Sequence, residues 1–403
     1  MNSSHLRDLK SVYLIVGTAI GTGILALPIS TAQSGFLFSS LGLLICWLFM
    51  TLAAFFMMEA RLYFKNECDL DYMSEHTVGP KLEFFTKISY LVLLFSLMAA
   101  YILVGSSWMV EFIKSCFDYE LNKTLSMILF TLASAIIITQ GIRIVGKANH
   151  VVTVVLLISF AFIILLSINH IDCENLKEVG DLKSISSTMP LILTSFGFSI
   201  VIPTIVSYQD NDSKRTGESL IIGSIMILFA YFVWQLIAFG IIGKSGEDGL
   251  VSFLSSKEQS TEIVRALGQV VHNSYLLKTA RTFVIFAVIS SLLGVGMALY
   301  HFMLDAVKIQ ETTFKITTST VFTFIPPLAL LIFYPAGIVE VLNFAGIFVA
   351  IILGIIPCIM IWYGRYIKKL KTSYTCFGGK PLIIITALFF IYVIIQEIIN
   401  LFF

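Results

Sequence analysis

The sequence predicts an all-α integral membrane protein that crosses the bilayer eleven times. Its 403 residues are 57% hydrophobic and 13% charged, whereas a soluble domain carries about 25% charged residues. The apolar content amounts to about 230 residues, enough for about eleven spans of about 20 residues each. Many of these stretches are apolar on all sides, which excludes the alternating pattern of a β-barrel. The net charge is +1, so the composition does not favour nucleic acid as a partner.

Apolar stretches bounded by charged or turn residues predict the individual helices. In chain order they cover 11–34, 37–58, 84–113, 124–140, 148–168, 186–208, 219–243, 281–307, 316–333, 336–363 and 381–402. Only Tyr334 and Pro335 separate the ninth helix from the tenth, so this boundary is the weakest. In the long loop before the eighth helix, apolar residues from Ile263 to Tyr275 recur at helical spacing. They predict a short amphipathic helix, which either lies on the outer mouth or is an ordinary loop helix.

The distribution of Lys and Arg predicts a cytoplasmic N-terminus, because these residues collect on the cytoplasmic side of membrane proteins. Sixteen of them then fall in inner segments and nine in outer segments, five of these in the loop 244–281. An odd number of spans places the C-terminus outside. The first apolar stretch has no cleavage site near its end, so residues 1–403 are expected to form a single transmembrane domain. The six cysteines are scattered and predict neither a metal site nor a disulfide framework.

The first span contains an unusual cluster of residues that weaken a helix. The cluster consists of Gly17, Thr18, Gly21, Thr22 and Gly23, followed by Pro28. An unsatisfied backbone group is costly in lipid, so such a cluster is typical of an unwound segment that lines a cavity. The second half of the span would then begin near Gly21–Gly23 and point its N–H groups at an anion. The string alone is equally consistent with a small-residue packing face between helices.

A second cluster in the sixth span favours the broken-helix interpretation. Small residues from Thr194 to Gly197 lie in mid-span, and Pro203 follows Gly197 by six residues. The first and sixth spans occupy the same place in successive blocks of five helices. Interrupted spans in corresponding positions are typical of transporters built on inverted repeats. We therefore expect one repeat over about 11–168, a second over about 186–363, and one extra helix over about 381–402.

Several strings along the chain resemble one known family. They are Gly17–Pro28, SFGFSIVIPTIVSY (Ser195–Tyr208), YFVWQ (Tyr231–Gln235), SSLLGVGMALYHFMLD (Ser290–Asp305) and TFIPPLALLIFYPAG (Thr323–Gly337). The chain resembles the bacterial tryptophan/tyrosine permeases, which are part of the hydroxy and aromatic amino acid permease family. The resemblance implies a leucine-transporter-type fold, an inner-membrane location with a periplasmic C-terminus, and proton-coupled uptake of an aromatic amino acid without a cofactor. The chain departs from the family at His301, where the family carries an acidic residue.

The expected substrate site lies at the two breaks. The N–H groups of Gly21, Thr22 and Gly23 are expected to hold the substrate carboxylate, because the start of a helix attracts anions. The hydroxyl of Tyr101, near the middle of the third span, could donate to the same carboxylate, as in related folds. Its alternative role is a buried aromatic that bonds a backbone carbonyl.

The other end of the substrate is expected to meet the sixth span. Unwound carbonyls near Ser195–Gly197 would accept hydrogen bonds from the ammonium group. Phe196 and Phe198 are the candidate aromatic walls, and packing is the alternative role of each. Since they lie two residues apart, they need not both face the cavity.

The eighth span supplies the candidates for ion coupling. Sodium-coupled carriers of the resembled fold use paired hydroxyls there, which suggests that Ser290 or Ser291 faces Gly17 and Thr18. Alternatively, these serines bond to their own helix. His301 lies too far along the helix to be a direct ligand but could relay protons.

The leading hypothesis is therefore a proton symporter of tyrosine or tryptophan in the lipid bilayer, with sodium as the alternative ion. A serine or threonine permease of the same family is the alternative among transporters. A membrane-embedded enzyme is the rival from another class, but no nucleophile–base or metal constellation is visible. The GxxxxGK string at 141–147 lacks the following Ser or Thr of a phosphate loop.

Overall fold

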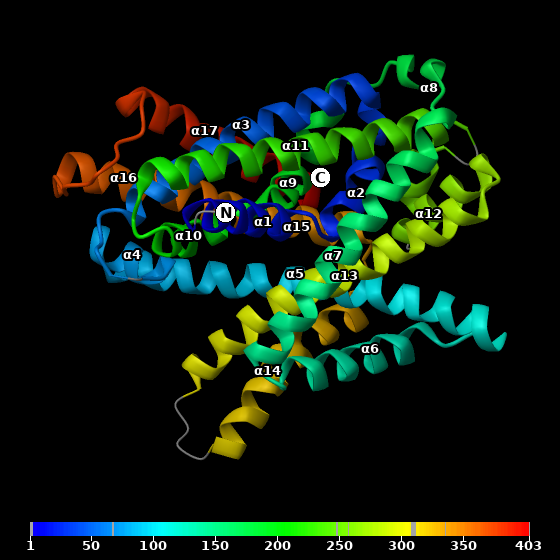
Figure 1. The fold of residues 1–403 in the computed structure, drawn as a ribbon, viewed down its shortest axis with the longest axis horizontal. Helices are drawn as coiled ribbons and strands as arrows, with labels where there is room; N and C mark the ends of the chain where they lie inside the picture. The colour runs from blue at the N-terminus through cyan, green and yellow to red at the C-terminus, as the bar shows by residue number, and fades with distance from the viewer. Residues whose placement is uncertain are drawn as a thin grey trace.

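The computed structural model describes residues 3–66, 68–246, 249–256, 258–307, 312–334 and 336–402, and every regular element in these ranges is helical (Figure 1). The longer helices are α1 (Ser3–Ala19), α2 (Thr22–Ser30), α3 (Gly35–Arg61), α4 (Leu70–Thr77), α5 (Pro80–Phe117), α6 (Lys123–Ile138), α7 (Ile142–Ser167), α9 (Ser184–Ser195), α10 (Ile202–Tyr208), α11 (Ser213–Ile242), α12 (Gln259–Val271), α13 (Ser274–Ala306), α14 (Thr312–Phe333), α15 (Ile338–Val349), α16 (Ile356–Trp362) and α17 (Gly379–Phe402). Short pieces complete the set: α8 (Cys173–Lys177), the 3₁₀ turns η1 (Ala32–Ser34), η2 (Ile168–His170), η3 (Gly197–Val201) and η4 (Ser252–Ser255), and the π turns η5 (Ala350–Ile355) and η6 (Tyr363–Ile367).

The prediction of an all-helical membrane protein is confirmed. In the described part of the chain, nine helical segments are long and apolar enough to cross a bilayer. The bent pair α1 and α2 can supply one further span, and α6 is a shorter apolar helix. Observed helices extend beyond several predicted ends. Helix α13 starts at Ser274 rather than near 281, because Lys278 and Arg281 continue the helix instead of ending it.

The weak boundary between the ninth and tenth predicted helices is real. Helix α14 ends at Phe333 and α15 begins at Ile338, and Tyr334 lies between them. Pro335 lies outside the described residues. The prediction of two separate helices is therefore confirmed on both sides of this point.

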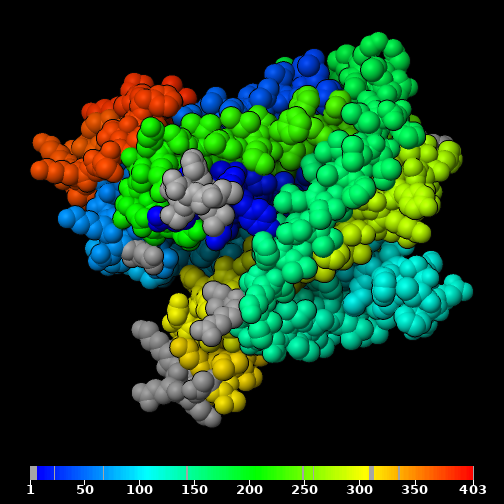
Figure 2. Space-filling view, in the orientation of Figure 1, coloured from blue at the N-terminus to red at the C-terminus, as the bar shows by residue number. Residues whose placement is uncertain are grey.

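Helix α1 lies at the centre of the packing. It runs along α11, while α2 packs against α9 and α11. Helix α13 crosses α7 and α5, and α15 packs against both α9 and α5 (Figure 1). Figure 2 shows part of α1, in dark blue, at the surface between the green α11 and the blue-green α7. The two spans that the sequence predicts to be broken therefore pack against several longer helices, and α1 keeps one exposed face.

The amphipathic loop helix is α12, and its position is close to the prediction. Ile263, Val264 and Leu267 are fully buried, and the helix packs against α11, α13 and α2. The predicted C-terminal end is wrong. His272 adopts a left-handed conformation with φ of 50° and ends α12, so Tyr275 belongs to α13 and is exposed.

A buried ion pair joins α3 to the end of the tenth predicted span. Glu59 is fully buried, and Arg365 donates from Nε to its Oε1 at 2.6 Å. The backbone N–H of Cys376 donates to the other carboxylate oxygen at 2.7 Å, and the Tyr63 hydroxyl donates to Oε1 at 3.0 Å. Burial, followed by the negative charge of Glu59, raises the pKa of Tyr63, so this hydroxyl keeps its proton. The cluster fixes the segment after η6 against α3.

Candidate functional site

The first span is broken where its small residues cluster. Helix α1 ends at Ala19 and α2 begins at Thr22, and the two helices meet at an angle of 51°. Gly21 adopts an extended conformation, with φ of −144° and ψ of −149°, at the start of α2. The predicted break near Gly21–Gly23 is therefore confirmed. The side chain of Thr22 lies outside the described residues.

The sixth predicted span is interrupted beside the first break. Helix α9 ends at Ser195, the tight turn η3 follows, and α10 begins at Ile202. A Cβ built on Gly23 would lie 2.6 Å from Ser195 Oγ and 3.2 Å from Ser195 Cα. Only glycine at position 23 therefore allows the two interrupted spans to approach so closely.

A cavity of about 420 Å³ occupies the region between the two breaks. This volume is within the range of small-molecule sites in proteins. It is lined by most of the residues that the sequence singled out, namely Gly17, Thr18, Gly21, Gly23, Tyr101, Ser195, Gly197, Ser290 and Ser291. These residues come from four parts of the chain, and the fold brings them together at one place.

Three of the predicted site residues lie away from this cavity. Phe196 and Phe198 are fully buried outside its lining, and Phe196 packs edge-on against Tyr231 at 5.0 Å between ring centroids. Neither ring is in the cavity lining, so the structure offers no support for their assignment as aromatic walls. His301 is exposed on α13 and is also outside the lining, beside the ring of Tyr300.

Aliphatic side chains form much of the wall, and Tyr13, Tyr90 and Tyr101 supply its aromatic part. Leu93, Leu94 and Leu97 line the cavity from α5, and Leu353 lines it from the π turn η5. A π turn inside an α-helix is frequent at functional sites. In η5, Gly354 lies so close to the ring of Phe390 that any Cβ would overlap it. The walls therefore depend on packing between distant helices, which the local sequence does not reveal.

A polar corner of the cavity involves α7, a predicted helix whose residues the sequence analysis did not assign to the site. The hydroxyl of Ser290 donates to Asn149 Oδ1 at 2.8 Å and lies 3.3 Å from Thr153 Oγ1. Asn149 and Thr153 lie four residues apart on α7, so they share one face of the helix. Asn149 and Thr153 both fall in the predicted span 148–168. Two polar side chains on one face of a membrane span could therefore have indicated this part of the site from the sequence. Ser291 lies beside Gly21, where any Cβ would overlap its hydroxyl oxygen.

Tyr231 is a second residue that the sequence analysis did not assign to the site. It is fully buried on α11, and its hydroxyl lies 2.7 Å from the carbonyl oxygen of Ala19 and 2.6 Å from that of Ser195. The hydroxyl therefore joins the ends of the two helices that precede the breaks. The string YFVWQ includes Tyr231, but the sequence does not show which groups its hydroxyl contacts.

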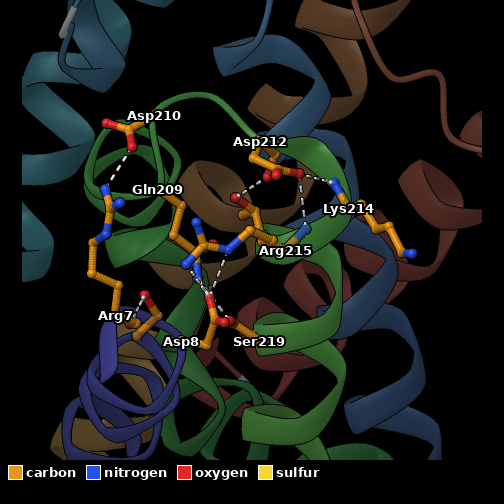
Figure 3. Close-up of polar contacts among 10 residues, drawn as sticks. Arg7, Asp8, Gln209, Asp210, Asp212, Lys214, Arg215 and Ser219 are labelled. Carbon is orange, nitrogen blue, oxygen red and sulfur yellow. Dashed lines mark hydrogen bonds and ion pairs between the residues drawn. The ribbon is translucent and has the colours of Figure 1, made fainter. Parts of the chain in front are cut away.

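The cavity extends along the C-terminal half of α1, where Leu14 and Thr18 are exposed lining residues. Nearer the N-terminus, Figure 3 shows the start of α1 held to the segment before α11 and to the first turn of α11. Arg7 donates to Asp210 at 2.5 Å, and Arg215 donates to Asp8 at 2.7 Å. Among the described residues, no group of three or more His, Cys, Asp or Glu side chains could hold a metal ion.

Comparisons with known proteins agree with this architecture. The chain is 29% identical to a tyrosine-specific transport system of Haemophilus influenzae, over 94% of this chain and 93% of the relative. It is 27% identical to a tryptophan-specific transport protein of the same organism, over 97% and 95%. It is also 28% identical to a glutamine transporter of Aliivibrio fischeri, over 96% and 98%.

A solved structure supports the same fold. Mhp1, a nucleobase-cation-symport-1 family transporter in a closed conformation with bromovinylhydantoin bound, superposes with a TM-score of 0.64 at 13% identity. The match covers 98% of this chain and 90% of that one. The model of the tryptophan/tyrosine permease family matches residues 6–397. With its apolar spans, the chain is a multi-pass membrane protein, a permease rather than an enzyme, and it belongs to the tryptophan/tyrosine permease family.

Proposed function

We propose that the protein is a secondary active transporter that imports tyrosine or tryptophan by proton symport. The observation that carries this proposal is the cavity at the two helix breaks, where free backbone groups and apolar walls meet. An amino acid has a carboxylate, an ammonium group and a side chain, and the cavity offers a complement to each. The curated relatives named for tyrosine and tryptophan support the substrate class.

In this proposal the chain is one transmembrane domain of eleven spans. The bent pair α1 and α2 counts as one span, and α6 counts as a short one. The first repeat covers about 11–168, the second about 186–363, and α17 is the extra helix. The N-terminus is cytoplasmic and the C-terminus periplasmic in a bacterial inner membrane. The cavity extends along α1 from the break to Tyr13 and Leu14, so in this orientation it opens to the cytoplasm, and α12 lies on the opposite side.

The substrate carboxylate is assigned to the start of α2. The first N–H groups of a helix have no partner within the helix and carry a partial positive charge. Gly21 and Gly23 line the cavity here, and the backbone of Thr22 lies between them. Tyr101, also in the lining, is assigned as a second donor to the same carboxylate. The ammonium group is assigned to the carbonyls near Ser195.

The substrate side chain is assigned to the aliphatic part of the cavity. Leu93, Leu97 and Leu353 offer apolar surface there. Burial of apolar surface contributes about 25 cal/mol per Å², and an aromatic side chain buries about 150–250 Å². The walls therefore favour a large apolar side chain over that of serine or threonine.

The coupling ion is assigned to the corner between α1, α7 and α13. Ser291 lies against Gly21, and Thr153 lies against Gly17, with 3.6 Å between its methyl carbon and a Cβ built on that glycine. The hydroxyl oxygens of Ser290 and Thr153 thus lie 3.3 Å apart beside α1, and oxygen atoms are the ligands that hard cations require. The site could bind sodium, or a water molecule if protons drive transport.

Uptake into proteoliposomes tests this proposal. We expect saturable tyrosine uptake that rises with an inward proton gradient in sodium-free buffer. Tryptophan should compete strongly, and serine and glutamine weakly. Ser290→Ala and Ser291→Ala should be compared with Ser159→Ala, a buried serine of α7 outside the cavity. A sodium requirement that Ser291→Ala removes would contradict proton coupling, and stronger competition by glutamine than by tryptophan would contradict the aromatic substrate.

A further inference from the structure

Tyr231 contacts both helix breaks through a single oxygen atom. Its hydroxyl lies within hydrogen-bond distance of the Ala19 carbonyl, at 2.7 Å, and of the Ser195 carbonyl, at 2.6 Å. Ala19 is the last residue of α1 and Ser195 is the last residue of α9. The last carbonyls of a helix lack N–H partners within the helix. Both carbonyls therefore need a donor from outside their own helix. The Tyr231 hydroxyl lies within reach of both.

A phenol has only one proton to donate. At any moment one carbonyl accepts that proton, and the other faces the lone pairs of the hydroxyl oxygen. Three oxygen atoms thus meet around one proton, so Tyr231 can satisfy only one of the two carbonyls at a time. A buried acceptor without a donor is unfavourable, so a ligand that brings donors to this place is stabilised.

The surroundings keep this arrangement in place. Tyr231 is fully buried, and the ring of Phe196 packs against it edge-on. The phenol therefore cannot turn away to relieve the shortage. Ala19 and Ser195 both line the cavity, so a ligand there can reach their backbone.

We propose that Tyr231 is a positioning residue that holds the two helix breaks together and selects ligands with a protonated amine. The inference rests on the proposed function. An ammonium group has three donors. When it donates to one of the two carbonyls, the Tyr231 hydroxyl donates to the other, and every acceptor is satisfied. A ligand without the amine leaves the shortage in place.

The test compares Tyr231→Phe with Tyr300→Phe, a buried tyrosine of α13 outside the cavity lining. Binding of tyrosine is measured beside that of 3-(4-hydroxyphenyl)propionate, which keeps the carboxylate and ring but lacks the amine. Tyr231→Phe should weaken tyrosine by about tenfold, because the two carbonyls are no longer held together to receive the ammonium group, and a hydrogen bond to a charged group is worth about this much. It should leave the analogue unchanged, and Tyr300→Phe should change neither. Equal weakening of both ligands, or of neither, would overturn the selection by Tyr231.

A second measurement does not depend on any ligand. Amide hydrogen exchange should become faster in Tyr231→Phe at both 19–25 and 195–202, because the two breaks lose their shared contact. Faster exchange at only one break, or at neither, would overturn the bridging role. If the wild-type protein bound no amino acid, the proposed function would fail, and the exchange measurement would still decide the role of Tyr231.

Discussion

The two helix breaks share a sequence signature but differ in geometry. At the first break, α1 and α2 meet at 51° and are separated by Ile20 and Gly21. At the second, α9, η3 and α10 continue as one span over Ser184–Tyr208. The first break is a bend, whereas the second is a local tightening of the helix. Glycine and proline in mid-span therefore predict an interruption but not its shape.

Neighbouring helices explain why the glycines differ in importance. At the first break, a Cβ on Gly21 would overlap Ser291, and a Cβ on Gly23 would press on Ser195. At the second break, a Cβ on Gly197 would lie 3.9 Å from Leu353 Cδ1, an ordinary van der Waals contact. The first pair of glycines serves close packing between spans, while Gly197 has room for a side chain.

The largest effect is expected for Gly23→Leu. The new side chain would meet the backbone of Ser195, which cannot move without displacing α9. Tyrosine uptake should be abolished while the protein remains in the membrane at wild-type level. Gly146→Leu is the matched control, because a Cβ at this helical glycine of α7 meets open space. Normal uptake by Gly23→Leu would show that the two breaks do not need to touch.

An intermediate effect is expected for Gly21→Ala. The methyl group would overlap the hydroxyl of Ser291 but would lie 3.4 Å from its Cβ. Overpacking of this kind costs about 1–3 kcal/mol, so tyrosine affinity should fall about tenfold. The double variant Gly21→Ala with Ser291→Ala removes the overlapping oxygen and should recover most of the affinity. Binding is the suitable measurement, because Ser291 is also a candidate for ion coupling. Additive losses in the double variant would contradict the assigned contact.

The smallest effect is expected for Gly197→Ala. The position has room for a methyl group, and Gly197 is not among the glycines with positive φ. Uptake should change less than about twofold. A loss as large as that of Gly21→Ala would show that the second break also depends on glycine, and the contrast between the breaks would fail.

These cases show which features could be predicted from the sequence. Composition and apolar stretches predict the helices, because each span must satisfy its own backbone hydrogen bonds in lipid. By the same rule, glycine, serine and threonine clustered in mid-span around Gly21 and Ser195 stand out, because they weaken a helix where an unpaired backbone group is costly. The sequence therefore predicted both breaks and most of the cavity lining near them. Ser291 was named because sodium-coupled carriers of the resembled fold use paired hydroxyls on this span, and in the structure it lies beside Gly21.

Other site features depend on contacts between distant segments. The hydroxyl of Tyr231 meets Ala19 across 212 positions, and Ser290 meets Asn149 across 141. No pattern of neighbouring residues in the sequence predicts such long-range contacts. The orientation of Phe196 was not predictable for a related reason, because the direction of a side chain between α9 and η3 depends on the break and on neighbours such as Tyr231. Aromatic residues beside a break are as suited to packing as to binding.

The buried pair of Glu59 and Arg365 has a consequence for biosynthesis. The two residues are 306 positions apart. At about 5–20 residues per second, the ribosome reaches Arg365 roughly 15–60 s after Glu59. During this interval the carboxylate lacks the guanidinium that it contacts in the finished fold. This end of α3 can therefore reach its final environment only late in synthesis, and a chain released before Arg365 would carry an unpaired acidic group that the complete protein hides.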